Sequence, residues 1–214
     1  MDAIEYQIHK DLGASFLDSI QSITNQVKKF NKAESAYFLI SGKGFSFPEF
    51  SWGDDFELRI ELDLDNEKIL NQFEQALPFQ FDDSRKFWSS YVCYISQVFC
   101  KALDSRKSLL RFCQISSDQC ALFHTDFVYA RLFQTIKGPG TEFLMESNVN
   151  REGLGSGCNS NIVRDMSKVC RVNEKDIMVM RGEKWIASKG LVHRSPPIKG
   201  KGLKRLFLSL DPLK

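Results

Sequence analysis

The fold is decided by residues 56–64, FELRIELDL, in which every second residue is apolar. Phe56, Leu58, Ile60 and Leu62 alternate there with acidic and basic side chains. Because successive side chains of a β-strand point to opposite faces, this period of two predicts a half-buried strand. A strand of this kind needs a second layer of structure to cover its apolar face.

Helical patterns lie on both sides of this strand. Apolar residues recur at steps of three and four in residues 11–30, 65–77 and 82–103, and Pro78 separates the last two segments. We therefore expect three amphipathic helices whose apolar stripes belong to the core. The stripe of the first helix consists of Phe16, Ile20, Ile23 and Val27.

The second half of the chain has a different character. From Leu109 onward, short β-like runs are divided by turn residues, which predicts a sandwich or barrel packed on the helices, and hence an α+β fold. Gly138-Pro139-Gly140-Thr141 predicts a tight turn, and the Gly-, Ser- and Asn-rich residues 148–161 predict a mobile loop. The expected strands are residues 109–115, 127–136, 141–144, 176–180, 189–193 and 203–210.

Length and composition bound the class of protein. We expect one domain over residues 1–214, with residues 1–105 as a mainly helical support with a few strands and residues 106–214 as a β-rich metal-binding core. A net charge of +2 gives no broad positive field, which argues against a nucleic-acid partner.

No stretch reaches the ~20 apolar residues of a membrane span, and the N-terminal residues do not resemble a secretory signal. The six cysteines form no CxxC pair. We therefore expect a cytoplasmic protein with reduced thiols and no membrane partner.

Two of the three histidines lie in the β-rich half, where a carboxylate accompanies them. His124 and Asp126 are two positions apart, so in a strand their side chains project to one face and can approach one ion. His193 can supply a third ligand from a later strand. Two imidazoles and one carboxylate leave coordination positions open on an octahedral ion, as in the non-haem Fe(II) oxygenases.

A surface or hydrogen-bonded histidine is the plainer interpretation, because His-x-Asp is a common tripeptide. The downstream residues favour the metal site, since Arg205 lies on the strand after His193 and a guanidinium can bind a carboxylate through two parallel hydrogen bonds. An ordinary arginine at a strand edge is the alternative for Arg205.

We can also predict the positions of three residues near the site. Cys120 as a ligand would favour zinc, but four residues in a strand separate it from His124 by about 13 Å, so we expect it to support the ligands or pack in the core. Glu142 is expected to be an exposed strand carboxylate. Arg194 is expected at the mouth of the site, where it could meet an anionic substrate.

Five blocks of the chain are distinctive: CALFHTD at 120–126, RLFQTIKGPGTE at 131–142, MRGEKW at 180–185, GLVHRSP at 190–196 and RLFLSLD at 205–211. They resemble the bacterial family of domain of unknown function 1826, over residues 85–211. More distantly, the order of His-x-Asp, Arg131, Thr135, His193 and Arg205 is similar to the prolyl-4-hydroxylase-like branch of the 2-oxoglutarate oxygenases.

This resemblance implies a double-stranded β-helix, a jelly roll of the cupin type, in the C-terminal half. It implies iron bound by His124, Asp126 and His193, and 2-oxoglutarate bound through its far carboxylate by Arg205. Tyr129 and Arg131 are further candidates for cosubstrate binding. The implied activity is hydroxylation of a small molecule or a protein side chain.

Two other functions remain open from the sequence. One is a non-catalytic metal-binding or sensing protein, with zinc on the same three residues. The other is an interaction module that binds a partner through its helical half, whose signature would be an exposed stripe on the helix of residues 11–30.

Overall fold

The computed structural model describes residues 3–30, 35–49, 51–186 and 188–213. Its α-helices are α1 (Ala3–Leu12), α2 (Ala14–Phe30), α3 (Asn66–Ala76), α4 (Arg85–Ala102) and α5 (Asn159–Ile162). Its strands are β1 (Tyr37–Ile40), β2 (Phe56–Asp63), β3 (Lys107–Ile115), β4 (Ala130–Lys137), β5 (Glu142–Phe143), β6 (Cys170–Arg171), β7 (Ile177–Arg181), β8 (His193–Arg194) and β9 (Arg205–Leu213).

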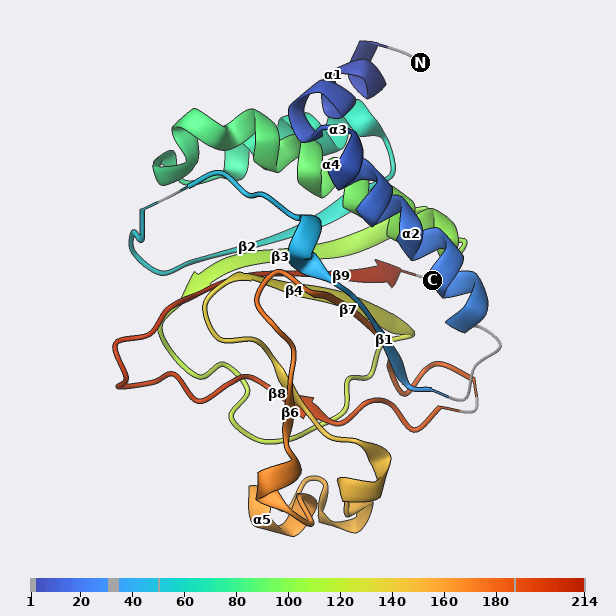
Figure 1. Ribbon diagram of the computed structural model, residues 1–214, viewed down its shortest axis with the longest axis vertical. Coiled ribbons are helices and arrows are strands. Elements are labelled where there is room, and N and C mark those ends of the chain that lie inside the picture. The colour runs from blue at the N-terminus through green and yellow to red at the C-terminus, as the bar shows by residue number, and fades with distance from the viewer. Residues whose placement is uncertain (1–2, 31–34, 50, 187, 214) are drawn as a thin grey trace.

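The strands form two antiparallel sheets. The larger has six strands in the order β1-β7-β4-β9-β3-β2, and the smaller has the order β6-β5-β8. Helices α1 to α4 cover one face of the large sheet, while β6, β8 and α5 lie beyond its other face (Figure 1). The mixed α and β architecture with antiparallel sheets confirms the α+β prediction.

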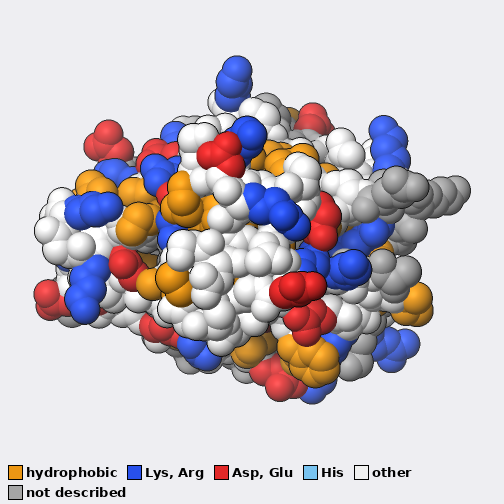
Figure 2. Space-filling model, turned by 90° about the horizontal axis from the view of Figure 1, so that it is seen from below, with side chains coloured by type: hydrophobic (Ala, Val, Ile, Leu, Met, Phe, Trp, Pro, Cys, Tyr) orange, Lys and Arg blue, Asp and Glu red, His pale blue; other side chains and the backbone are white. Residues whose placement is uncertain are grey.

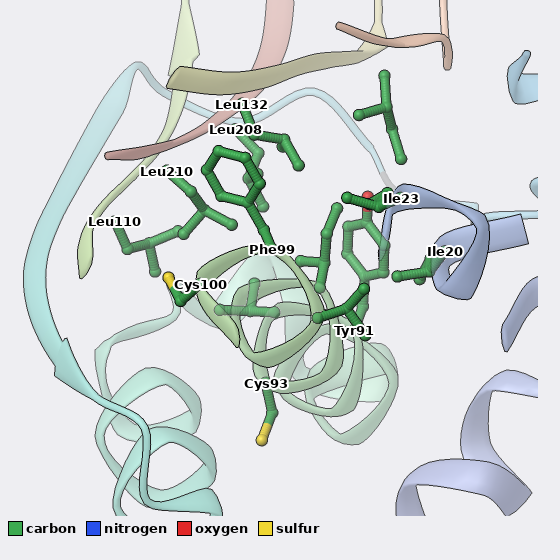
Figure 3. Packing of buried hydrophobic residues seen from close by; sticks show 14 of the residues in the cluster. Ile20, Ile23, Tyr91, Cys93, Phe99, Cys100, Leu110, Leu132, Leu208 and Leu210 are labelled. Carbon is green, nitrogen blue, oxygen red and sulfur yellow. The ribbon is translucent and has the colours of Figure 1, made fainter. Parts of the chain in front are cut away.

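The first core lies between α4 and the large sheet. Leu132 of β4 and Leu208 of β9 point toward Phe99 of α4 (Figure 3), and all three are fully buried. The α2 stripe packs into the same core, with its four residues at most 3% exposed. The exposed stripe that an interaction module would need is therefore not present on α2.

The opposite face of the large sheet meets the small sheet. Phe133 of β4 and Phe207 of β9 belong to a second buried cluster that includes Phe143 of β5 and Leu191. Because side chains alternate along a strand, β9 gives Leu206, Leu208 and Leu210 to the helical side and its other residues to the space between the sheets. That space contains the candidate site.

One sequence expectation is corrected here. The polar residues 148–161 are not an unstructured loop: they contain a 3₁₀ turn at Arg151–Gly153 and the start of α5, and Asn148 is buried with its amide donating to the Asp165 carbonyl at 3.0 Å. Figure 2, seen from the α5 side, shows mainly uncharged polar and backbone atoms at the centre of this face. The first half also supplies both edge strands, β1 and β2, of the large sheet.

The predicted turn after β4 is present. Gly138 has φ +98°, and a Cβ there would lie 2.1 Å from the Lys204 carbonyl oxygen, so only glycine fits. No helix in the described part of the chain is both long and apolar enough to cross a membrane. The cytoplasmic location stays a prediction.

Candidate metal centre

The two histidines of the site meet through their backbones. His124 and His193 form an isolated antiparallel bridge, with N–H to carbonyl distances of 3.0 and 2.9 Å. Their rings lie 4.7 Å apart between centroids. The His124–Asp126 segment precedes β4, which begins only at Ala130, so the expectation that it lies within a strand is wrong. The bridge to β8 holds His124 in place instead.

Asp126 completes the cluster. One carboxylate oxygen lies 3.2 Å from Nε2 of His193, and the other lies 3.6 Å from Nε2 of His124. One ligand atom from each of the three residues lies within 4.8 Å of the other two. The structure therefore brings together the three residues that the sequence singled out, in an arrangement that can hold one metal ion.

The second nitrogen of each histidine is also engaged. Nδ1 of His124 lies 2.8 Å from the Leu122 carbonyl, and Nδ1 of His193 lies 3.0 Å from the Leu191 carbonyl. A carbonyl oxygen can only accept, so Nδ1 carries the proton in both rings. Loss of the proton from Nε2 would therefore direct both Nε2 lone pairs at the shared centre, as metal-binding histidines require.

Arg131 supports Asp126 from β4. Its Nη1 donates to Asp126 at 2.6 Å, while Nε and Nη2 donate to the two oxygens of Asp211 at 2.6 and 2.5 Å. Burial alone would raise the pKa of Asp126, but hydrogen bonds from His124 and His193 and the positive charges nearby hold that pKa well below its usual range. The carboxylate is therefore ionised, as an anionic metal ligand would have to be.

The hydrogen bond to Asp126 raises the pKa of His124 in turn. In the absence of an ion, the two side chains stabilise each other's charged form.

Arg205 lies at the start of β9 and is 2% exposed. Its Nη2 donates to the hydroxyls of Thr135 and Thr141 at 2.8 and 3.1 Å, but its buried Nε has no hydrogen-bond partner. Among the described residues, no carboxylate pairs with it. Burial lowers the pKa of this guanidinium to about 10, so it is still charged at neutral pH.

A cavity of about 250 Å³ joins these groups. Its lining includes the three residues of the metal cluster, Arg205 and the rings of Phe133 and Phe207. A buried cation without a counter-ion is costly, so the arrangement favours an anion beside Arg205. The same cavity thus contains a cluster that could hold a metal ion and a buried guanidinium that could bind an anion.

Three further expectations are corrected by the structure. Tyr129 stacks on Trp185 at 4.5 Å between centroids and does not belong to the cavity lining, so it is not positioned to assist a cosubstrate. Glu142 is 5% exposed, because Arg171 and Arg194 both pair with it. Cys120 is exposed and lines the cavity, so its expected packing in the core is wrong, while its support of the ligands stays a prediction.

Sequence reasoning missed Asp211, Arg111 and Arg59, which also line the cavity. A usable signal existed for Asp211. It lies six residues after Arg205 in the same strand, and an even spacing places both side chains on one face. Arg111 and Arg59 lie on β3 and β2, and no local pattern connected those strands with the histidines.

The fold is shared with a protein of known structure. The dioxygenase TqaL, described as Fe(II)/α-ketoglutarate-dependent, shares the fold: the TM-score is 0.52 at 10% identity, and the match covers 94% of this chain and 90% of TqaL. A putative 2OG-Fe(II) oxygenase family protein from Caulobacter crescentus matches at a TM-score of 0.41 and 12% identity, covering 99% of this chain and 74% of that protein, and this weaker likeness supports no argument.

The chain belongs to the family described as "Protein of unknown function (DUF1826)", whose model matches residues 57–211. The match includes β2, α3 and α4 in addition to the β-rich half, so it begins earlier than the sequence blocks indicated. No curated protein matches the sequence.

Proposed function

We propose that this protein is an Fe(II)- and 2-oxoglutarate-dependent oxygenase that hydroxylates a substrate held in the cavity. The observation that carries the proposal is the buried Arg205 guanidinium, which has no carboxylate partner among the described residues, in the same cavity as the His124, Asp126 and His193 cluster. A metal-binding protein without a cosubstrate would have no use for this costly buried charge. The fold shared with TqaL agrees with the proposal.

The donor set fits iron. His124 and His193 would bind through Nε2 and Asp126 through a carboxylate oxygen, which leaves positions open on an octahedral ion. A closed structural zinc site needs a fourth protein ligand, and the cluster found among the described residues has three. We infer further that the two sheets correspond to those of a double-stranded β-helix.

Each residue has a defined task in this scheme. Iron would supply the dioxygen and electron-transfer chemistry. Arg131 orients Asp126, and Asp211 orients Arg131. Arg205 would bind the far carboxylate of 2-oxoglutarate through its free Nε, while Phe133 and Phe207 exclude water around the cosubstrate.

The test compares metal content, 2-oxoglutarate binding and succinate release. The His124→Ala/His193→Ala double variant is expected to lose bound iron and all succinate release. His9→Ala is the matched control, because His9 lies on α1 outside the cavity lining and its loss should change neither quantity. Unchanged metal content in the double variant would refute the proposal.

Arg205 is tested separately. Arg205→Gln is expected to weaken 2-oxoglutarate binding about tenfold or more while iron still binds. If the wild-type chain binds zinc tightly and 2-oxoglutarate titration gives no heat, a non-catalytic metal protein replaces the oxygenase.

A further inference from the structure

We propose that Arg59 and Arg111 bind the anionic group, a carboxylate or a phosphate, of a small-molecule substrate. This inference rests on the proposed function, because it assigns the substrate to the same cavity. Among the described residues, the cavity lining contains five arginines: Arg59, Arg111, Arg131, Arg194 and Arg205.

Three of these arginines have other tasks. Arg131 is held between Asp126 and Asp211. Arg194 donates to Glu142 at 2.7–2.8 Å, lies over the Phe123 ring at 4.4 Å and has a side chain only 12% exposed, so it is less accessible to a ligand than Arg59 and Arg111. Arg205 is the cosubstrate anchor. Arg59 and Arg111 are left for the substrate.

The two remaining arginines share one carboxylate. Arg111 binds Glu57 through Nε and Nη2 at 3.0 and 3.1 Å, and Arg59 also donates to Glu57. One ionised carboxylate between two guanidiniums leaves one positive charge uncompensated. The hydrogen bond from Arg111 lowers the pKa of Glu57, which therefore stays charged at neutral pH. Side-chain exposures of 23% for Arg111 and 63% for Arg59 leave both accessible to a ligand.

The register of the large sheet aligns these residues with the metal cluster. Phe133 pairs with Ser209, Ser209 with Arg111, and Arg111 with Arg59, so the four form a row across β4, β9, β3 and β2. The ring of His193 stacks on Phe133 at 6.0 Å. Strands are ~4.8 Å apart, so the backbone of Arg111 lies roughly 10 Å across the sheet from that of Phe133.

The residue between Phe133 and Arg111 in this row has a small side chain. Ser209 lines the cavity and leaves an open path from the metal cluster to Arg111. A substrate whose reacting carbon lies at the cluster can therefore extend across Ser209 and place its anionic group on Arg111 and Arg59. The cavity of about 250 Å³ must also hold the cosubstrate, which restricts the reacting end to a small molecule.

Arg205 and Arg111 enter the cavity from separate positions. Arg205 pairs with Ile115 on β3, four residues from Arg111. Four residues of a strand separate the two backbones by about 13 Å, so Arg205 and the Arg111–Arg59 pair can each bind an anionic group of their own.

The experiment titrates the metal-free full chain with inorganic phosphate and, separately, with glutarate, by calorimetry at low salt. Arg111→Gln and Arg59→Gln are each expected to weaken binding of the preferred anion, by about tenfold when combined. Glu57→Gln should strengthen binding, because it releases both guanidiniums. Lys107→Gln is the control: Lys107 lies on the same face of β3 and pairs with Glu61 outside the cavity lining.

The two anions distinguish a phosphate-bearing substrate from a carboxylate-bearing one. Affinity that stays unchanged in the Arg59→Gln/Arg111→Gln variant for both anions would overturn the inference. Binding that is lost only in Arg205→Gln would also overturn it, although the proposed function would stand. Loss in the double variant but not in Arg205→Gln supports the inference even if iron and 2-oxoglutarate fail to bind.

Discussion

Arg131 is the residue on which the geometry of the metal cluster depends. It makes three hydrogen bonds of 2.5–2.6 Å to two carboxylates, one of which, Asp126, is a ligand group and the other of which, Asp211, is 8% exposed. Resemblance alone suggested a cosubstrate contact for Arg131. Its pairing with both aspartates makes it a positioning residue, because its donors are directed at the carboxylates.

We expect Arg131→Gln to lower the free energy of unfolding by about 3 kcal/mol, because it leaves Asp211 buried without a partner. The measurement is urea unfolding of the metal-free protein. The Arg131→Gln/Asp211→Asn double variant should recover part of the loss, since it removes the unpaired charge. Strictly additive effects would show that the two side chains are not coupled.

The cysteines provide a second test at this scale. Burial raises the pKa of Cys93 to about 12 and the pKa values of Cys100 and Cys113 to about 11. Cys158 is exposed, and a hydrogen bond from Ser160 lowers its pKa. A thiolate is the reactive form, so iodoacetamide at neutral pH should label Cys158 readily.

The three buried thiols should be labelled only in denaturant. Peptide mass spectrometry after short labelling measures this directly. Rapid modification of Cys100 in the folded protein would contradict the packing of α4 on β3, and rapid modification of Cys113 would contradict the packing between the two sheets.

At the scale of elements, one face of β9 packs in the core and the other face lines the cavity. Leu208 faces α4 in the first core and is fully buried, whereas Arg205 faces the cavity from the same strand. This division follows from the period of two, which places Arg205, Phe207, Ser209 and Asp211 on one face.

We expect Leu208→Ala to cost about 2–5 kcal/mol of stability, because it opens a cavity in the core, while the affinity for iron and 2-oxoglutarate stays unchanged. Arg205→Gln should instead lower the affinity for 2-oxoglutarate and change the stability less. Thermal unfolding and calorimetric titration of the two variants measure both quantities. A large loss of 2-oxoglutarate affinity in folded Leu208→Ala protein would show that the two faces are not independent.

The positions of the elements were predictable to different degrees. The alternation of residues 56–64 correctly predicted β2, and the apolar stripes predicted α2, α3 and α4 to within a few residues. The strand expected at 127–136 begins at Ala130, because Asp126 and the residues after it bond to the 182–184 turn instead of a neighbouring strand. The pattern of apolar residues does not show whether a segment bonds to a turn or pairs with a neighbouring strand.

At the scale of the whole molecule, the two halves of the chain share one sheet. Edge strands β1 and β2 come from the first half, and they pair with β7 and β3 of the second. The helices α2 and α4 pack on strands from both halves. A helical support that folds apart from the β-rich core would leave these edges unpaired.

We therefore expect the chain to unfold in one cooperative transition. Far-UV circular dichroism reports on all elements, and tryptophan fluorescence reports on Trp88 inside the helical layer, Trp185 beside Tyr129 and the exposed Trp52. The two melting curves should coincide, as they do for a two-state domain. A separate, earlier transition in the dichroism curve would indicate that the helical half is an independent unit.

The sequence by itself determined α2, α3 and α4, most of the strands and the three candidate ligand residues, because periodicity and residue chemistry are encoded within a few positions. Only the tertiary structure decided that His193 pairs with His124, that Arg131 is held by two carboxylates and that Glu142 is buried. These contacts join residues on different strands and loops. They depend on how the small sheet packs against the large one, which no local pattern specifies.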